Sequence, residues 1–360
     1  MKKSLIALAI ASAVSAPAFA ATSNVDVYGV LNMSVDFIDT DVPAAAKSTS
    51  VTSTASRIGF KGAEDLGGGM AAIWQIESGF NADEQSGTLA SRNTYVGLKG
   101  DFGTVLMGNH DTPMKLLGRS VDNFADTMAD SRNILGAVNI TTAGVTTSTN
   151  LFDLRTKNTV AYISPNWSGF SLAAAWVADW STGLTPGTAV SSLDNNSADA
   201  YSITATYNNG PLMLGGGYEA HNSILTVKSN VDMWRIVAGF DIAGFKLAGE
   251  YEQIGGDVAA YKHDAYGVFA TYNMGAWAFK ANYLDAMHSD ATPNNDAGYQ
   301  TTIGADYSLS KRTVVYGLYA LTKNDTNAAY GLGTGVGASD LTAHLNANPS
   351  VFSLGVKHSF

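Results

Sequence analysis

Two-residue alternation recurs along most of this chain of 360 residues and constrains its fold more than any other feature. Between 24 and 37, apolar side chains occupy one face of an extended strand and mostly polar side chains occupy the other. The segment FKLAGEYEQI at 245–254 repeats the pattern, and its polar face carries Glu250 and Glu252. Such a face is too charged for a protein core. The pattern therefore predicts β-strands with a polar face toward water and an apolar face toward a different environment.

Sixteen segments of this kind follow one another, and the turns between them are alternately short and long. An even number of strands, each about ten residues long with aromatic residues near its ends, is typical of an outer-membrane β-barrel. In lipid every backbone polar group must bond within the protein, so the sheet must close on itself. Sixteen strands leave an aqueous channel. We predict an all-β fold, a 16-stranded antiparallel transmembrane β-barrel; the competing interpretation is a secreted soluble β protein, which would also alternate.

The first twenty residues have the features of a secretory signal peptide. Lys2 and Lys3 precede the apolar run LIALAIASAV, and small residues surround position 20. We expect cleavage after Ala20 and a single barrel domain over 21–360. No later stretch approaches the roughly 18–20 consecutive apolar residues of a membrane-spanning helix. The chain contains no cysteine, so we expect the fold to close without disulfides.

The apolar pattern changes to a helical period between 111 and about 132, in DTPMKLLGRSVDNFADTMADSR. On a helix at about 100° per residue, Asp122, Asp126 and Asp130 would share one face and Phe124 and Met128 the opposite one. We predict a short amphipathic helix that shows its carboxylates to a water-filled lumen. The alternative is an ordinary surface helix with a solvated acidic face. We call the whole insertion at 111–153 the excursion, and loops of this length are usually functional.

Strand parity places several basic side chains on the polar, inward face. The predicted inward set is Arg57, Lys61, Arg92, Arg155, Lys157 and Arg235. The same parity places Tyr95 on the lipid side. Basic and acidic rows that face each other across a narrow passage create a transverse field, which favours polar solutes over apolar ones. The alternative role for these arginines is to fix loops or to contact neighbouring subunits.

Catalysis and cofactor binding find little support in the sequence. The six histidines are scattered without the spacing of a metal site, and no G-x-S-x-G motif is present. The run GLGTGVG at 331–337 lacks the strand, Lys-Ser/Thr and helix of a phosphate loop. Without Lys2 and Lys3 the chain has 19 basic and 31 acidic residues, which disfavours nucleic acid as a partner. We predict no enzymatic activity, no catalytic or metal residues and no cofactor.

Five stretches resemble the general bacterial porin family, especially its neisserial and proteobacterial branch, over essentially the whole mature length. They are NVDVYGVL, SRIGFKGAEDLGGGMAAIWQIE, SRNTYVGLKGDFGTVLMGNHDTP, RTKNTVAYISPNWSGF and the terminal GVKHSF. The resemblance implies a homotrimer in the Gram-negative outer membrane, in contact with its lipid. Lipopolysaccharide is a candidate partner of acids in the external loops, such as Asp194, Asp199, Asp257 and Asp290, through bridging divalent cations. It implies that the third external loop, here 111–153, folds into the lumen as the constriction and faces an arginine cluster matching Arg57, Arg92 and Arg155.

The resemblance also implies that Phe360 is the end signal read by the barrel-assembly machinery. One departure concerns Asn109 and His110, which stand where many relatives carry Gly-Arg. One expected basic residue is therefore missing near the base of the constriction loop. The strength and sign of ion selectivity stay open at this point.

We therefore expect an outer-membrane porin for passive diffusion of ions and small hydrophilic solutes. One alternative is a substrate-selective channel for phosphate, a sugar or another nutrient, which should carry a ladder of aromatic or basic residues along its path. Another alternative is a barrel used for adhesion or structure, which should carry large external domains. The sequence shows a compact basic cluster and short loops, which favours the diffusion porin.

Overall fold

The computed structural model describes residues 25–42, 47–142, 145–178, 199–224, 229–291, 295–333 and 344–360. The predicted signal peptide at 1–20 and part of the 331–337 run lie outside these residues. Sixteen strands form the wall of a barrel. They are β1 (Val25–Asp39), β3 (Arg57–Gly67), β4 (Met70–Asn81), β6 (Thr94–Gly100), β7 (Gly103–Asp111), β10 (Arg155–Ile163), β11 (Phe170–Val177), β12 (Ala200–Asn209), β13 (Leu212–Ile224), β14 (Ser229–Ile242), β15 (Phe245–Gly256), β16 (His263–Met274), β17 (Trp277–Ala286), β18 (Gly298–Ser308), β19 (Thr313–Asn324) and β20 (Ser350–Ser359).

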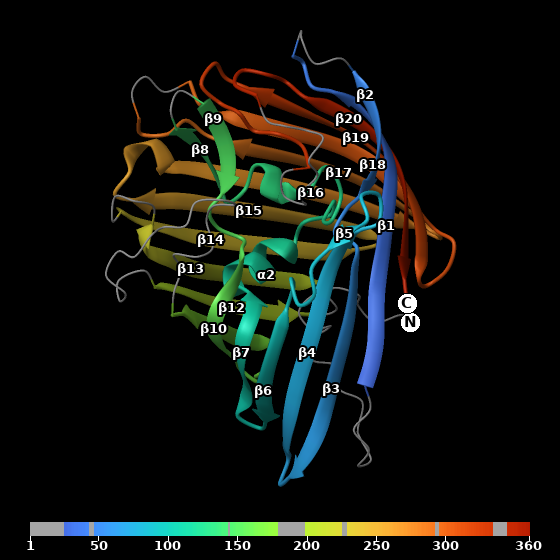
Figure 1. Ribbon diagram of the computed structural model, residues 1–360, viewed down its shortest axis with the longest axis vertical. Coiled ribbons are helices and arrows are strands. Elements are labelled where there is room, and N and C mark those ends of the chain that lie inside the picture. The colour runs from blue at the N-terminus through green and yellow to red at the C-terminus, as the bar shows by residue number, and fades with distance from the viewer. Residues whose placement is uncertain are drawn as a thin grey trace.

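Each wall strand pairs antiparallel with its neighbours in the chain, and the last strand closes the ring on the first. In the β1–β20 ladder, Val30 lies opposite Ser359 and Asp39 opposite Ser350. The other edge of β1 pairs with β3 along its first half and with the short strand β2 (Ser48–Ser53) along its second half. Figure 1 shows the strands arranged as this ring, with β1 beside β20. The predicted 16-stranded antiparallel barrel is confirmed.

The two faces of the wall have opposite chemistry. On β1 the outward-facing Val25 and Val27 are 55% and 56% exposed, whereas the inward-facing Asn32 and Asp36 are buried inside the barrel. Side chains of alternating residues point to opposite faces of a strand, so this pattern follows from period two. The apolar outer surface meets the lipid. Among the described residues, no helix has the length and apolar character needed to cross a membrane.

Tyr95 faces the interior, so its predicted place on the lipid side was wrong. Its ring centroid lies 5.4 Å from that of the inward-facing His110, while the adjacent Val96 points outward and is 56% exposed. The prediction counted parity through Arg92, but β6 begins only at Thr94. Parity applies only within a continuous strand, and the irregular backbone before Thr94 shifts it by one residue.

The excursion joins β7 to β10 and lies within the ring of strands (Figure 1). It contains the helix α2 (Pro113–Arg119), a 3₁₀ turn η1 (Ser131–Asn133) and a hairpin of β8 (Ala137–Thr142) and β9 (Val145–Asn150). Two further short elements are β5 (Ser86–Gly87) and the 3₁₀ turn η3 (Ala259–Tyr261). Helix α2 begins where Thr112 accepts a hydrogen bond from the Lys115 backbone, with proline at the first helical position.

The amphipathic helix predicted over 111–132 is therefore much shorter than expected. It ends at Arg119, and Asp122, Asp126 and Asp130 lie in the turns that follow. The aspartates themselves explain this, because their side chains bond to nearby backbone and compete with the helix. Asp122 accepts a hydrogen bond from the Phe124 backbone, Asp126 has a positive φ of 62°, and Asp130 caps η1.

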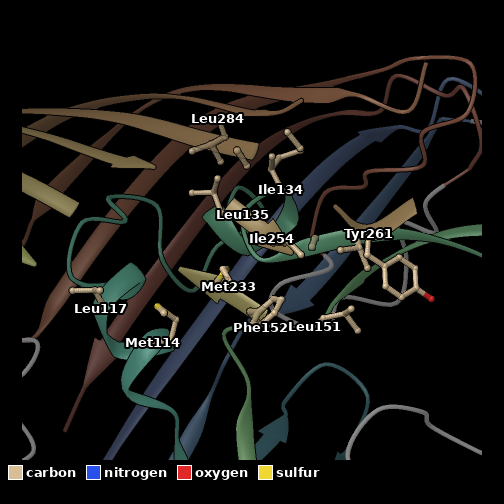
Figure 2. Close-up of a cluster of buried hydrophobic side chains, with 14 of the residues drawn as sticks. Met114, Leu117, Ile134, Leu135, Leu151, Phe152, Met233, Ile254, Tyr261 and Leu284 are labelled. Carbon is tan, nitrogen blue, oxygen red and sulfur yellow. The ribbon is translucent and has the colours of Figure 1, made fainter. Parts of the chain in front are cut away.

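Two apolar clusters fix the excursion to the inner wall. In the larger one, Met114, Leu117, Leu135 and Phe152 of the excursion meet wall residues that include Met233, as Figure 2 shows. In the second, which we call the tip cluster, the turns after α2 contact strands β1, β19 and β20. Its members are Ile38, Phe124, Met128, Ala129, Tyr316, Leu318, Ala320, Leu332 and Val351. Each buried Leu, Met or Phe side chain contributes about 1.5–3 kcal/mol, so the excursion is a fixed part of the barrel.

Candidate functional site

Two acidic side chains of the excursion pair with arginines of the same segment. Arg119 binds both Asp126 and Asp130, with N–O distances of 2.5 and 2.8 Å. Arg132 binds Asp130 at 2.7 Å, and Asp130 is fully buried. The sequence analysis selected the three aspartates but missed Arg119 and Arg132. The signal for these pairs was an arginine on each side of the run of three aspartates.

Asp122 and Asp130 have different environments although both lie in the same turns. Asp122 accepts hydrogen bonds only from the backbone of Phe124 and Ser131, at 2.9 and 3.0 Å. Burial, followed by the charge of the neighbouring Asp130, raises the pKa of Asp122 to about 6. Burial also opposes ionisation of Asp130, but Arg132 and Arg119 outweigh it and lower the pKa of Asp130 to about 2. Of these two aspartates, Asp122 is the one whose charge changes near neutral pH.

The wall strands bring basic side chains to the excursion. Arg57 on β3 binds Asp126 at 3.2 Å and donates to the Ala55 carbonyl. Lys61 lies four residues further along β3 and on the same face. Its Nζ is 5.3 Å from the centroid of the Tyr28 ring. Lys357 lies on the inward face of β20, opposite Asn32. Neither Lys61 nor Lys357 forms a salt bridge with any described residue, although the carboxylate of Asp126 lies near enough to Lys357 to stabilise its charge.

Arg92 and Arg155 are inward-facing but bound to acids of the wall. Arg92 binds Glu77 at 2.6 Å. Arg155 binds Asp111 at 3.0 Å, and Lys115 of α2 binds the same carboxylate at 2.8 Å. Two cations therefore share one acid at the base of the excursion. Lys157, the other inward candidate of this strand, is exposed.

The prediction that Arg235 belongs to the basic lining of the lumen needs correction. The side chain points inward as expected, but the excursion covers it and it is only 1% exposed, so it does not line open lumen. Its guanidinium binds Asp153 at 2.6 Å, Glu250 at 2.6 Å and Glu252 at 2.5 Å, and donates to the Met114 carbonyl. Because Met114 and Asp153 belong to opposite ends of the excursion, one arginine ties both ends to the wall.

Phe360 stands at the seam between the last and the first strand. Its backbone N–H donates to the Gly29 carbonyl at 3.1 Å, and the Gly29 N–H donates to the Phe360 carbonyl at 3.0 Å. The ring lies so close over Gly29 that a Cβ at this position would clash with it. The Phe360 side chain is 43% exposed on the outer face.

These features describe a closed barrel with a charged segment inside it, and comparison with known proteins decides the family. A family model described as Gram-negative porin matches residues 7–327. The chain belongs to the Gram-negative porin family. This porin is 30% identical to outer membrane porin protein 32 of Delftia acidovorans, over 100% of both chains. It is 26% identical to major outer membrane protein P.IB of Neisseria gonorrhoeae, over 87% of this chain and 91% of the relative.

Solved porins share the fold. The anion-selective porin from Comamonas acidovorans superposes with a TM-score of 0.77 at 24% identity, covering 94% of this chain and 100% of that chain. The trimer form of OmpT from Vibrio cholerae gives a TM-score of 0.66 at 16% identity, over 94% and 100%. Our porin is thus an outer-membrane channel for passive diffusion of ions and small hydrophilic solutes. Its family and fold are those of channels without enzymatic activity.

Proposed function

We propose that the excursion forms the constriction of the channel and that the channel prefers anions. The observation that carries the proposal is that two acids of the excursion have basic partners in the same segment. Arg119 and Arg132 bind Asp126 and Asp130 there. With Arg57 added, three arginines balance the three aspartates of this segment. Lys61 and Lys357 then add two positive charges, neither of which forms a salt bridge with a described carboxylate. A lumen with this excess attracts anions and raises the barrier for cations.

The proposal is tested by reversal potentials in a planar bilayer under a salt gradient. For the refolded wild type we expect a reversal potential whose sign indicates preference for anions. The double variant Lys61→Gln, Lys357→Gln should lower the anion-to-cation permeability ratio several-fold. Lys323→Gln is the control, since Lys323 lies on the outward face of β19. A cation-selective wild type, or a double variant equal to it, would refute the proposal.

Acidification should increase anion preference through Asp122. Its pKa of about 6 lies above the ordinary value of an aspartate, so the group is ionised above this pH and neutral below it. Between pH 7 and pH 5 Asp122 therefore loses its negative charge, and Lys115, whose pKa burial lowers to about 7, becomes fully charged. Both changes should move the reversal potential toward the anion limit. Asp122→Asn should move the reversal potential at pH 7 toward the anion limit and should weaken the pH response, leaving only the part that belongs to Lys115. An unchanged pH response in this variant would assign the titration to another group.

We also propose that the porin assembles as a homotrimer through the outer face of β20, β1, β2 and β3. Outward-facing Tyr and Trp side chains mark the lipid headgroup region in barrels of this kind. Strands β11 to β18 carry a girdle of them near their outer ends. Its members are Trp176, Tyr201, Tyr218, Trp234, Tyr251, Tyr266, Tyr283 and Tyr299.

The proposed interface carries no such girdle. Its described outward side chains include Val27, Leu31, Phe37, Leu354 and Val356, which are apolar and exposed. An apolar face without headgroup-binding residues suits contact with protein. OmpT from Vibrio cholerae, of the same fold, has a trimer form. Conductance steps that appear in groups of three would support the trimer.

Three further partners and one processing step remain proposals. The girdle is suited to outer-membrane lipid and lipopolysaccharide, because Tyr and Trp place an apolar ring in the membrane and a polar atom at its surface. The exposed ring of Phe360 at the end of β20 suits recognition by the barrel-assembly machinery. We propose removal of residues 1–20 as a signal peptide, which leaves the barrel domain at 21–360.

A further inference from the structure

The outer face of the barrel is hollowed over strands β18 and β19. Ala305 lies directly opposite Gly317 in the ladder of these strands, and strand parity turns this small pair outward. The outward pairs on either side of it are larger: Ile303 opposite Tyr319, and Tyr307 opposite Val315. A groove with a volume of about 550 Å³ lies over the small pair.

Apolar side chains of the adjoining strands form the two sides of the groove. On one side, Leu354 of β20 lies opposite Gly317 in the β19–β20 ladder and is exposed on the outer face. On the other side, Trp277 of β17 contacts Tyr307, and their ring centroids are 4.7 Å apart. The outer face of the barrel meets lipid, so an apolar groove in it fits a hydrocarbon chain.

One end of the groove lies beside the short turns of the barrel. Trp277 directly follows the turn at 275–276, and Tyr307 lies close to the turn at 309–312. Short turns of outer-membrane barrels lie on the periplasmic side, and outward Trp and Tyr side chains gather at the level of the lipid headgroups. This end of the groove therefore reaches the headgroups of the periplasmic leaflet.

The turn at 309–312 carries two adjacent basic residues, Lys311 and Arg312, and both are exposed. It joins the two strands that form the floor of the groove. Among the short turns between the described wall strands, it is the only one that contains a basic residue. Neither side chain forms a salt bridge with a described residue. Two cations at this level of the membrane attract a negatively charged headgroup.

We propose that the groove binds an anionic phospholipid of the periplasmic leaflet, such as phosphatidylglycerol. One acyl chain would lie over Gly317, between Trp277 and Leu354, and the headgroup phosphate would bind to the basic turn. Because other lipid chains are as apolar as the groove, the chain gains only packing contacts, and the headgroup charge supplies the preference. A Lys or Arg near the membrane surface favours an anionic lipid roughly fivefold.

Quenching of Trp277 fluorescence in lipid vesicles tests the site. The porin is reconstituted in phosphatidylcholine with a small fraction of lipid whose brominated chains quench a tryptophan on contact. The signal of Trp277 is the difference between each protein and the same protein with Trp277→Phe. Brominated phosphatidylglycerol should quench this signal at a several-fold lower mole fraction than brominated phosphatidylcholine.

Two variants of basic residues test the role of the turn. Lys311→Gln combined with Arg312→Gln should remove the difference between the two brominated lipids. Lys246→Gln is the matched control, because Lys246 lies at the start of β15 beside another short turn on the same side. This control should keep the difference seen in the wild type. Loss of the difference in Lys246→Gln as well would assign it to the total charge of the barrel and would overturn the proposal.

Filling the groove distinguishes a bound lipid from general attraction to the basic turn. Ala305→Phe places a ring in the groove and keeps both cations, and it should lower the preference for phosphatidylglycerol several-fold. An unchanged preference in this variant would overturn the proposal. The comparison of lipids in the wild type needs no variant, and equal quenching by both would overturn the proposal too. Absence of quenching by either lipid would do the same, and would indicate that a neighbouring subunit covers the groove.

Discussion

Replacing Arg235 with methionine is expected to release the excursion from the barrel wall and to produce a larger, noisier single-channel conductance. The guanidinium is the shared partner of Asp153, Glu250 and Glu252 in a fully buried place. Without it, three buried carboxylates would repel one another across the junction between excursion and wall. Removing one partner of a buried ion pair costs about 3–5 kcal/mol, and here three acids lose their partner at once.

Single-channel recording and thermal unfolding together measure this effect. Arg155→Met is the matched control, because Arg155 is also inward-facing but shares its acid with Lys115, which remains. A second variant, Arg235→Met with Glu250→Gln and Glu252→Gln, removes most of the unpaired charge and should recover quiet conductance. Wild-type conductance and stability in Arg235→Met alone would show that the apolar clusters suffice to hold the excursion.

Replacing Arg119 with glutamine is expected to shift the channel strongly toward cations. Arg119 is the only described group that binds both Asp126 and Asp130. Its loss removes one positive charge and leaves the Asp126 carboxylate with Arg57 alone. The net charge of the excursion falls by one unit at the proposed constriction, where a charge near protein acts more strongly than in bulk water. We expect the anion-to-cation permeability ratio to fall about tenfold, which corresponds to about 1.4 kcal/mol.

Reversal potentials of the variants Arg119→Gln, Arg119→Lys and Arg312→Gln distinguish the effect of the charge at position 119 from the effect of the guanidinium geometry. Arg119→Lys keeps the charge and should stay near the wild-type ratio. Arg312→Gln removes a charge at the exposed turn between β18 and β19 and should have no effect. If Arg119→Lys and Arg119→Gln shift the ratio equally, the guanidinium geometry matters rather than its charge, and the proposed charge balance of the excursion is incorrect.

The barrel was predictable from sequence because two independent constraints agree. Alternation assigns a face to each side chain, and the absence of water in lipid forces the strands to close. The long pairing of β14 with β15, with Arg235 opposite Glu252, follows from these constraints alone. The basic residue and its acidic neighbour on the next strand could have been recognised as a pair. Their burial could not, because the covering segment comes from about 80 to 120 positions earlier in the chain.

The conformation of the excursion was harder to predict, because hydrogen bonds between aspartate side chains and nearby backbone amides compete with the helix. The helical period of 111–132 is present in the sequence, yet the bonds from Asp122 and Asp130 to backbone amides end the helix early. Helical projection then put the three aspartates on an open face, while the structure turns Asp126 and Asp130 toward Arg119. Tyr95 shows the related problem for strands, where one irregular residue reverses all later assignments.

The pairing of β1 with β20 also determines when the molecule can complete its fold. Val30 meets Ser359, so the two strands that complete the ring are separated by nearly the whole chain. Contacts between such distant positions form slowly, because closing a long loop carries an entropic penalty before any hydrogen bond forms. No partial product leaving the ribosome can close the ring, and every shorter chain would present two open strand edges. The ring can therefore close only after the last strand has been made, and until then the open strand edges need protection from aggregation.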